Sequence, residues 1–387
     1  MTSPDDERSR HQHILEEARR FAHEEVRPRA RDFDERGELA RDLIAKMATQ
    51  GFLLARLPQQ YGGLGLDPVT YGLVTEEIGK ACCSSRALMT VECSLVGETL
   101  LAWGTEDQKR RWLQAIAKEG KLGAFALTEP EIGSDARGVK TTFEARGDDY
   151  ILNGRKKWTS FGAIADFFLV VAMKDSSATV FLVERDQPGV RVTPMKGLLA
   201  GRAAHLAEIE LENVCVPKDR MVGKPGSAFP YVVGTALDHG RYSVAWGGVA
   251  IAQASLEAMV TYARTRTQFG QKIAEFQLVQ GMIGEAVAKI HAARALCLRA
   301  GELRQRRDPD AIMETTIAKH FSAQIAMEVA TDAVQVHGGN GCSSSYPVER
   351  LFREAKVLNI IEGTAQIQQQ MIAKYGLRKY YHRPSPE

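Results

Sequence analysis

Two polar clusters in the first half of this 387-residue sequence carry side chains suited to binding an anion or a flat ring. The first is FALTEPEIGSD at residues 125–135, where hydroxyl groups and the backbone N–H groups of a Gly-containing turn come close together. The second is KKWTSFG, in which Trp158 precedes Thr159 and Ser160. Each has a simpler explanation, because the first also fits a strand entering a turn and a strand tryptophan is usually a core residue.

Two further clusters lie in the second half of the chain. RTRTQFGQKIAEFQ, at residues 264–277, contains Arg266 near a predicted helix break. A guanidinium presents a fixed fork of donors that suits a phosphate, and a solvated charge at a helix end is the alternative. QVHGGNG is followed by IIEGTAQIQ, which contains Glu362. This carboxylate fits a helix cap, and it equally fits a general base whose proton affinity an apolar pocket raises.

Other kinds of site are not indicated. The nine histidines form no HExxH or paired-ligand pattern, and His11 and His13 are expected to be exposed on a charged helix, so we predict no metal site. No G-x-G-x-x-G motif supports a Rossmann nucleotide site. The six cysteines form no CxxC pair and are expected to be reduced core thiols; they are Cys82, Cys83, Cys93, Cys215, Cys297 and Cys342.

Composition narrows the possible partners. Lys and Arg total 50 against 48 Asp and Glu, a net charge of +2, so we expect no nucleic-acid partner. No apolar run is expected to reach the roughly 20 residues of a membrane span, and the polar start lacks the hydrophobic region of a signal peptide. We therefore expect a cytoplasmic protein without a membrane partner.

The elements that must position these clusters are mainly helices around a central β domain. Apolar residues recur at helical spacing from about 8 to 122, change to a period of two from about 123 to 228, and return to helical spacing beyond Pro230. The predicted domains are 1–122, 123–228 and 229–387. The last contains long helices at about 231–265, 275–306 and 309–336, then shorter ones at 348–356 and from near Gly363. Helices of ~30 residues are about 45 Å long, and their surplus apolar faces suggest subunit contacts.

Six motifs, in this order and at these intervals, resemble the acyl-CoA dehydrogenase family across essentially the whole chain: FALTEPEIGSD, KWTSFG, RTQFGQKIAEFQ, QVHGGNG, YPVERLFREAK and IIEGTAQIQ. The resemblance implies an N-terminal helical domain, a middle β domain and a C-terminal four-helix bundle. It also implies FAD as cofactor, a homodimer or homotetramer, oxidation of an acyl thioester, and an electron acceptor protein as a further partner.

The resemblance assigns cofactor contacts position by position. Along the flavin it places Phe125, Leu127, Thr128, Gly133, Ser134, Trp158 and Ser160, with Thr128 near the reactive N5 and Ser134 also reaching the substrate. On the pyrophosphate and adenosine half, from a neighbouring subunit, it places Arg266, Phe269, Gln277, Gln335, Gly338 and Gly339. Thr364 and Gln366 are expected near the cofactor. The FAD site would therefore require oligomerisation.

The resemblance also makes Glu362 the expected catalytic base, in place of the cap that local sequence favours. Some family members carry the base on the long helix that begins the C-terminal domain, but the equivalent residue here is Gly240, which cannot accept a proton. Arg241 keeps the family's arginine, and it is expected at the substrate with Gly363. Two small departures, Ser160 for the commoner Thr and Glu354 for Asp, affect packing only.

CCSSRALMT and GRYSVAWG resemble a narrower branch that oxidises small polar acyl groups on an acyl carrier protein in polyketide or peptide biosynthesis. Arg86 then becomes a candidate contact to a polar acyl group or to phosphopantetheine, with a helix-surface arginine as the alternative. Trp246 either narrows the acyl pocket or belongs to the helix core. Acyl-CoA and acyl-carrier-protein substrates both stay open. The alternative functions are an acyl-CoA oxidase that uses oxygen and a flavin-free scaffold of the same fold.

Overall fold

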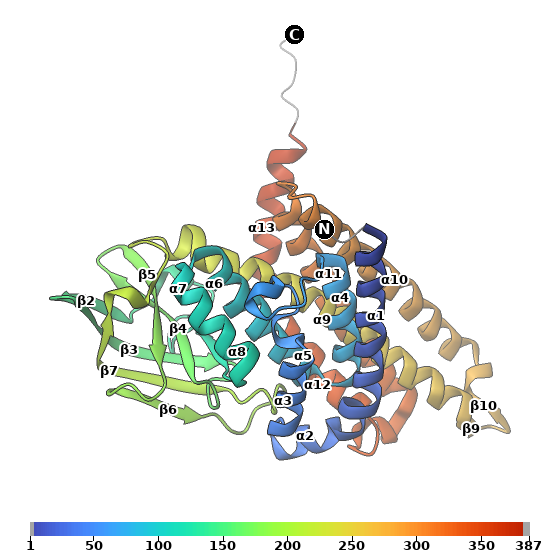
Figure 1. Ribbon diagram of the computed structural model, residues 1–387. Helices are drawn as coiled ribbons and strands as arrows, with labels where there is room; N and C mark the ends of the chain where they lie inside the picture. The colour runs from blue at the N-terminus through green and yellow to red at the C-terminus, as the bar shows by residue number, and fades with distance from the viewer. Residues whose placement is uncertain (1–3, 382–387) are drawn as a thin grey trace, which may run out of the picture. The chain divides into compact units, whose positions relative to one another are not determined.

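The computed structural model describes residues 4–381 (Figure 1), with backbone only for residues 4 and 5. The ends of the two terminal predicted domains, residues 1–3 and 382–387, lie outside the described residues. The chain forms two compact units, Met1–Ser243 and Val244–Glu387. The first contains the early helices and the β-sheet, and the second contains most of the long helices, so the units are described in turn.

The first unit opens with helices, as the spacing of its apolar residues predicts. The α-helices are α1 Pro4–Phe21, α2 Ala30–Arg36, α3 Arg41–Thr49, α4 Pro68–Ala81, α5 Cys83–Met89, α6 Glu98–Trp103, α7 Glu106–Gln108 and α8 Gln114–Glu119. Wider π-helical turns join some of them: η1 Ala22–Val26, η5 Thr90–Gly97 and η6 Lys109–Leu113. Local signals fix α4, since Asp67 accepts a hydrogen bond from the Thr70 N–H and Pro68 occupies the first turn.

An eight-stranded sheet follows, drawn in green and yellow-green in Figure 1. Its strands are β1 Gly123–Ala126, β2 Thr142–Arg146, β3 Asp149–Thr159, β4 Phe167–Lys174, β5 Ser177–Glu184, β6 Val190–Pro194, β7 Ala207–Pro217 and β8 Met221–Val222. The order is β6-β7-β3-β2-β4-β5-β8, and β1 pairs in parallel with β4. Residues 167–172 of β4 are completely buried, as in a strand covered on both faces. The sheet thus holds the core, and β1, paired with the interior strand β4, leads into the Phe125–Ser134 segment.

The second unit consists chiefly of long helices. They are α9 Val233–Thr265, whose first residues belong to the first unit, then α10 Gln277–Gln305, α11 Ala311–His337, α12 Val348–Leu358 and α13 Ala365–Lys379. The long helices expected from the sequence are confirmed, with ends that agree to within two residues. Gly248 lets α9 pack closely against α11, because a Cβ at this position would lie only 2.7 Å from the backbone of Ser322. A short hairpin, β9 Thr267–Gln268 and β10 Gln271–Lys272, joins α9 to α10.

Several expectations about single residues are wrong. His11 is buried, and its Nδ1 lies 2.9 Å from Oδ2 of Asp67, 56 positions further along the chain. Cys215 and Cys342 are exposed and so are not core thiols, whereas the other four cysteines are buried or half-buried; all six are free. In the described part of the chain, one helical stretch, Ala228–Thr265, is long and apolar enough to cross a membrane. The expected lack of such a run was therefore wrong, although 67% of its most apolar window is buried inside the protein.

Candidate active site

In the first unit, backbone pairing brings the first two sequence clusters together. Thr128 lies just beyond β1, and its carbonyl accepts a hydrogen bond of 2.8 Å from the N–H of Lys157 on β3. The carbonyl of Leu127 accepts one of 3.2 Å from Nζ of Lys156. Phe125, Leu127 and Thr128 are half-buried and therefore still accessible from one side. The segment that contains Thr128 and the segment that contains Trp158 form one surface.

A buried carboxylate, that of Glu129, holds this surface together. Its Oε1 accepts hydrogen bonds from Lys156 Nζ at 2.8 Å, from Thr141 N at 2.9 Å and from Thr141 Oγ1 at 2.6 Å, while Oε2 accepts one from Lys140 N at 2.7 Å. Burial alone would raise the pKa of Glu129, but the hydrogen bonds from Lys156 and Thr141 hold it below its ordinary value. Burial lowers the pKa of the Lys156 ammonium to about 8. Sequence reasoning missed both residues, although the TEPE motif contains Glu129.

Trp158 stands in a strained position. Its φ of 61° falls where the β3–β7 register shifts, between Lys156 and Thr159, and its side chain is 51% exposed. A non-glycine residue with positive φ costs free energy, and such residues gather at functional sites. The alternative that Trp158 is an ordinary core residue is therefore wrong. Ser160 is half-buried beside it, and the buried Oγ1 of Thr159 has no partner among residues 4–381.

Gly133 and Ser134 lie in the exposed turn after Glu129. No atom lies within 4 Å of the position that a Cβ on Gly133 would occupy, so the backbone here is open to a ligand. The predicted flavin contacts of the first unit, from Phe125 through Ser160, are thus all half-buried or exposed.

Two predicted substrate contacts of the first unit lie on helices. Arg241 is half-buried on α9, directly after the buried Gly240. Arg86 lies on α5 and is only 2% exposed, so the helix-surface alternative is wrong. Trp246, which lies on the part of α9 that belongs to the second unit, is fully buried.

The β9–β10 hairpin of the second unit carries the third cluster. Phe269 and Gly270 form its two-residue turn, with φ values of 52° and 80°, and the Phe269 side chain is 95% exposed. Arg266 is exposed, and within residues 4–381 its guanidinium makes no ion pair. Gln277 begins α10 and is exposed. The hairpin therefore presents a free cation and an aromatic ring to solvent.

The predicted contacts at the end of α11 are also accessible. Gln335 lies in its last turn, and Gly338 and Gly339 follow, all exposed. Gly338 has a φ of 58°, and no atom lies within 4 Å of a Cβ position on either glycine. His337 between them is anchored, because its Nδ1 lies 2.7 Å from the Ala333 carbonyl and its ring stacks on Tyr262 at 4.2 Å.

Glu362 lies in the loop between α12 and α13. It is half-buried and has a φ of 55°, followed by Gly363 at 92°. Thr364, not Glu362, is the N-cap of α13, because its side chain accepts a hydrogen bond of 3.3 Å from the Ile367 N–H. The helix-cap interpretation of Glu362 is therefore wrong. Gln366 is exposed in the first turn of α13.

Two residues that sequence reasoning missed fix this loop. The fully buried Lys319 of α11 donates a hydrogen bond of 2.9 Å from Nζ to the carbonyl of Gly363. Asn359 donates one of 3.0 Å from Nδ2 to the Ala323 carbonyl and accepts one of 2.9 Å from the Ala365 N–H at its own carbonyl. The sequence does contain a signal for Lys319, which is a lysine among apolar residues in IAKHFSA.

These groups fit FAD in kind. Trp158 presents a flat exposed ring, Arg266 an exposed guanidinium suited to a pyrophosphate, and Gly338 and Gly339 an unobstructed backbone. Within the described residues, no group of three or more His, Cys, Asp or Glu side chains could hold a metal ion. The first unit thus carries an exposed aromatic ring, and the second carries a cation, an open backbone and Glu362 as candidate base.

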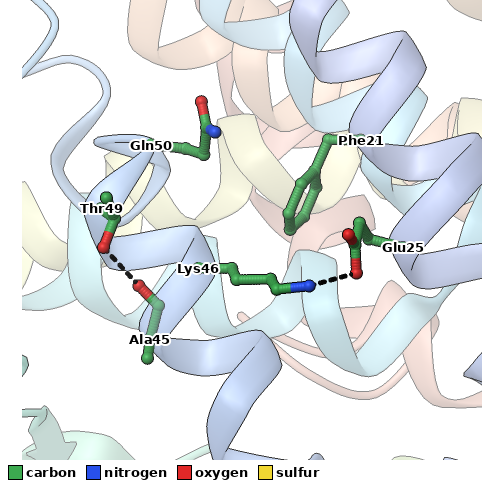
Figure 2. Close-up of a pocket in the computed structure, with 6 residues that line it drawn as sticks. All are labelled: Phe21, Glu25, Ala45, Lys46, Thr49 and Gln50. Carbon is green, nitrogen blue, oxygen red and sulfur yellow. Dashed lines mark hydrogen bonds and ion pairs between the residues drawn. The ribbon is translucent and has the colours of Figure 1, made fainter.

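A surface pocket of about 350 Å³ lies elsewhere, against α1, η1 and α3 (Figure 2). Phe21, Ala45, Thr49 and Gln50 line it together with an ion pair of 2.7 Å between Lys46 Nζ and Glu25 Oε2. None of the predicted site residues lines this pocket, and its two charged groups, Lys46 and Glu25, already bind each other. It is not a candidate for the active site.

Comparisons with known proteins agree with this geometry. Family models described as the acyl-CoA dehydrogenase N-terminal, middle and C-terminal domains match residues 8–120, 124–214 and 229–377. The probable acyl-CoA dehydrogenase YngJ of Bacillus subtilis is 37% identical over 373 residues, which cover 95% of this chain and 98% of the relative.

Solved structures are similar along nearly the whole chain. Butyryl-CoA dehydrogenase from Megasphaera elsdenii has a TM-score of 0.92 at 32% identity, covering 95% of this chain and 98% of its own. FkbI, which serves the biosynthesis of the methoxymalonyl extender unit of the Fk520 polyketide, has a TM-score of 0.87 at 33% identity, covering 93% and 99%.

Proposed function

The chain belongs to the acyl-CoA dehydrogenase family, and we propose that it oxidises a short, polar acyl thioester with Glu362 as the base that removes the α-proton. Family membership makes it a flavin-dependent oxidoreductase with FAD as cofactor, and not a flavin-free scaffold. When bound, FAD supplies the acceptor for the hydride that leaves the β-carbon.

The conformation of the Glu362 loop carries this proposal. A left-handed φ at a glutamate is unfavourable, and here Lys319 and Asn359 hold the residues beside it. Such strain is expected where the direction of a carboxylate matters for the reaction. Gly240 cannot serve as a base, so the family pattern offers Glu362 alone. Its backbone N–H is the proposed donor that stabilises the developing enolate oxygen.

The CCSSRALMT and GRYSVAWG segments and the similarity to FkbI support a small polar acyl group on a carrier protein or on CoA. The predicted cofactor contacts on the hairpin and after α11 support a homodimer or homotetramer. We also propose an electron acceptor protein as reoxidant and a cytoplasmic location for the enzyme. An oxygen-uptake assay separates this dehydrogenase from an acyl-CoA oxidase, because only the oxidase consumes oxygen in step with substrate.

The replacement Glu362→Gln tests the proposal. We expect the variant to retain FAD and its circular-dichroism spectrum but to bleach the flavin with substrate about 10²- to 10⁴-fold more slowly, the usual contribution of a general base. Anaerobic stopped-flow measurements with a panel of acyl-CoA and acyl-carrier-protein thioesters give the rates. Glu302→Gln, at an exposed position of α10, is the matched control. Equal bleaching rates in wild type and Glu362→Gln would remove Glu362 from its proposed role.

A further inference from the structure

Tyr262, near the C-terminal end of α9, contacts both segments of the second unit that are expected to bind the pyrophosphate and adenosine half of FAD. Its carbonyl accepts a hydrogen bond of 2.9 Å from the N–H of Arg266, the residue that leads into the β9–β10 hairpin. Its ring stacks on that of His337, with the centroids 4.2 Å apart. Its hydroxyl accepts a hydrogen bond of 2.8 Å from Nδ2 of Asn340. His337 and Asn340 lie on either side of the two exposed glycines after α11.

The base of the hairpin belongs to the same apolar cluster as Tyr262. The N–H of Ile273 donates a hydrogen bond of 3.0 Å to the carbonyl of Arg266, which closes the hairpin. The side chain of Ile273 is buried with those of Tyr262 and Ala263, and Val336 of α11 packs against them. The hairpin and the end of α11 therefore share one small core, and Tyr262 lies in it.

A third ring orients the stacked pair. Tyr346 meets Tyr262 edge-on, with the centroids 5.5 Å apart and the planes at 88°, and it lies 5.4 Å from the ring of His337. Nδ1 of His337 lies 2.7 Å from the carbonyl of Ala333. Stacked and edge-to-face contacts of this kind add to the stabilisation that burial provides. The imidazole is therefore restrained on several sides.

The hydroxyl of Tyr262 does more than the burial of its ring requires. Tyr262 is only 9% exposed, and a phenylalanine ring would fill the same space. The hydroxyl instead holds Asn340, which follows Gly338 and Gly339. No atom lies within 4 Å of a Cβ position on either glycine, so packing does not fix this turn. Its position therefore depends on the residues that flank it.

We propose that Tyr262 is a positioning residue that holds the Arg266 hairpin and the Gly338–Gly339 turn at a fixed separation, so that both bind the same FAD. The inference rests on the proposed function, through the expected contacts of these two segments with FAD. A guanidinium binds a phosphate in a defined geometry, so the open backbone of the turn must lie at a matching distance. Tyr262 does not touch FAD in this arrangement. It lowers the cost of ordering both contacts when FAD binds.

Release of FAD from the holoenzyme gives the first test. The rate is followed after dilution by the fluorescence of free FAD. Tyr262→Leu removes the ring and the hydroxyl and should release FAD about 10²-fold faster, whereas Tyr262→Phe keeps the ring and should release it about 5- to 10-fold faster. Tyr375→Phe, which removes a hydroxyl bonded to Lys379 in the same unit, is the matched control and should behave as wild type. A wild-type rate in Tyr262→Leu would overturn the proposal.

A double-mutant cycle separates positioning from a general loss of stability. Tyr262→Phe and Asn340→Ala remove the two ends of one hydrogen bond, so the double variant should release FAD no faster than the faster single variant. The melting temperatures, measured with saturating FAD, should stay close to that of wild type. Additive effects on the release rate, or faster release that follows a fall in melting temperature, would show that Tyr262 serves only the fold.

Arg266→Ala separates this inference from the proposed function. It should speed FAD release in the wild-type background and add little to Tyr262→Leu, because the hairpin is then already displaced. If Arg266→Ala releases FAD at the wild-type rate, the expected phosphate contact is wrong and the positioning role falls with it, while the dehydrogenase function stands. If Tyr262→Leu does not fold, Tyr262→Phe and Asn340→Ala carry the test. If no acyl thioester bleaches the flavin of the wild-type protein, the proposed function itself has failed.

Discussion

Glu362, Trp158 and Phe269 share an unfavourable backbone conformation, with φ values of 55°, 61° and 52°. Each left-handed residue of this kind costs on the order of 1–3 kcal/mol unless its surroundings impose it. All three were selected from sequence motifs for contact with substrate or cofactor. The strain agrees with the motifs at these three positions, although five further non-glycine residues of the described chain share it.

Lys319 is the residue on which the placement of Glu362 depends most directly. Its Nζ holds the carbonyl of Gly363 at 2.9 Å. We expect Lys319→Met to lower kcat about 10- to 100-fold with little change in KM, because the loop would lose the hydrogen bond that fixes the base. Losing a cation beside the loop should also raise the pKa of the base and move the acidic limb of the pH–rate profile to higher pH.

Two variants separate positioning from a general structural effect. Lys319→Arg should recover part of kcat, because it restores a cationic donor, and Lys289→Met, on the surface of α10, should behave as wild type. Steady-state kinetics between pH 5 and 9 provides the measurement. A fall in kcat with an unmoved pH profile and no recovery by arginine would mean that Lys319 acts only through stability.

Among the helices and strands, most could be predicted from the spacing of apolar residues, because the burial of one face of an element sets that spacing. β2 has little apolar pattern of its own, since only Phe143 among its five residues is buried, and its pairing with β3 decides its conformation. The contacts of Glu129 with Lys156 and of His11 with Asp67 span 27 and 56 positions, and Arg86 is buried by the tertiary fold. No local pattern reports such contacts, so the site motifs were predictable and the residues that hold them were not.

The junction between η5 and β1 offers a pH-dependent prediction. Both carboxylate oxygens of the buried Glu92 lie 3.1 Å from the N–H of Gly123, the first residue of β1. Burial raises the pKa of Glu92 well above its ordinary value of 4.5. Its stabilising contribution is therefore complete below pH 4.5 and is lost as the pH rises through the folded-state pKa.

Glu92→Gln should remove this dependence, because an amide is neutral at every pH and can still accept from Gly123. We expect the melting temperature of wild type to fall relative to that of Glu92→Gln as the pH rises from 5 to 8. The corresponding loss of unfolding free energy is at most about 1.4 kcal/mol per pH unit. Glu144→Gln, at an exposed position of β2, is the control. Parallel wild-type and Glu92→Gln curves would show that Glu92 ionises normally.

At the scale of the whole molecule, large apolar side chains remain uncovered in the Val244–Glu387 unit. Phe269 is 95%, Leu278 84% and Leu377 76% exposed. Side chains of this size bury well over 100 Å² when a partner covers them. A homo-oligomer would provide that cover, and it agrees with the expectation, drawn from the resemblance, that Phe269 and Arg266 reach the cofactor of a neighbouring subunit.

Arg266→Ala and Phe269→Ala separate the two roles that this hairpin is proposed to have. Arg266 should act through its charge on the pyrophosphate, so Arg266→Ala should lose FAD on dialysis while its mass by light scattering stays that of wild type. Phe269→Ala should weaken assembly, so its mass should fall on dilution and FAD should leave with dissociation. Arg306→Ala, exposed at the end of α10, is the control for the loss of a surface arginine. Arg266→Ala should thus lose FAD without dissociating, whereas Phe269→Ala should dissociate and lose FAD as a result. FAD retained by dissociated Phe269→Ala subunits would disprove a shared site. FAD retained by Arg266→Ala would disprove the phosphate contact.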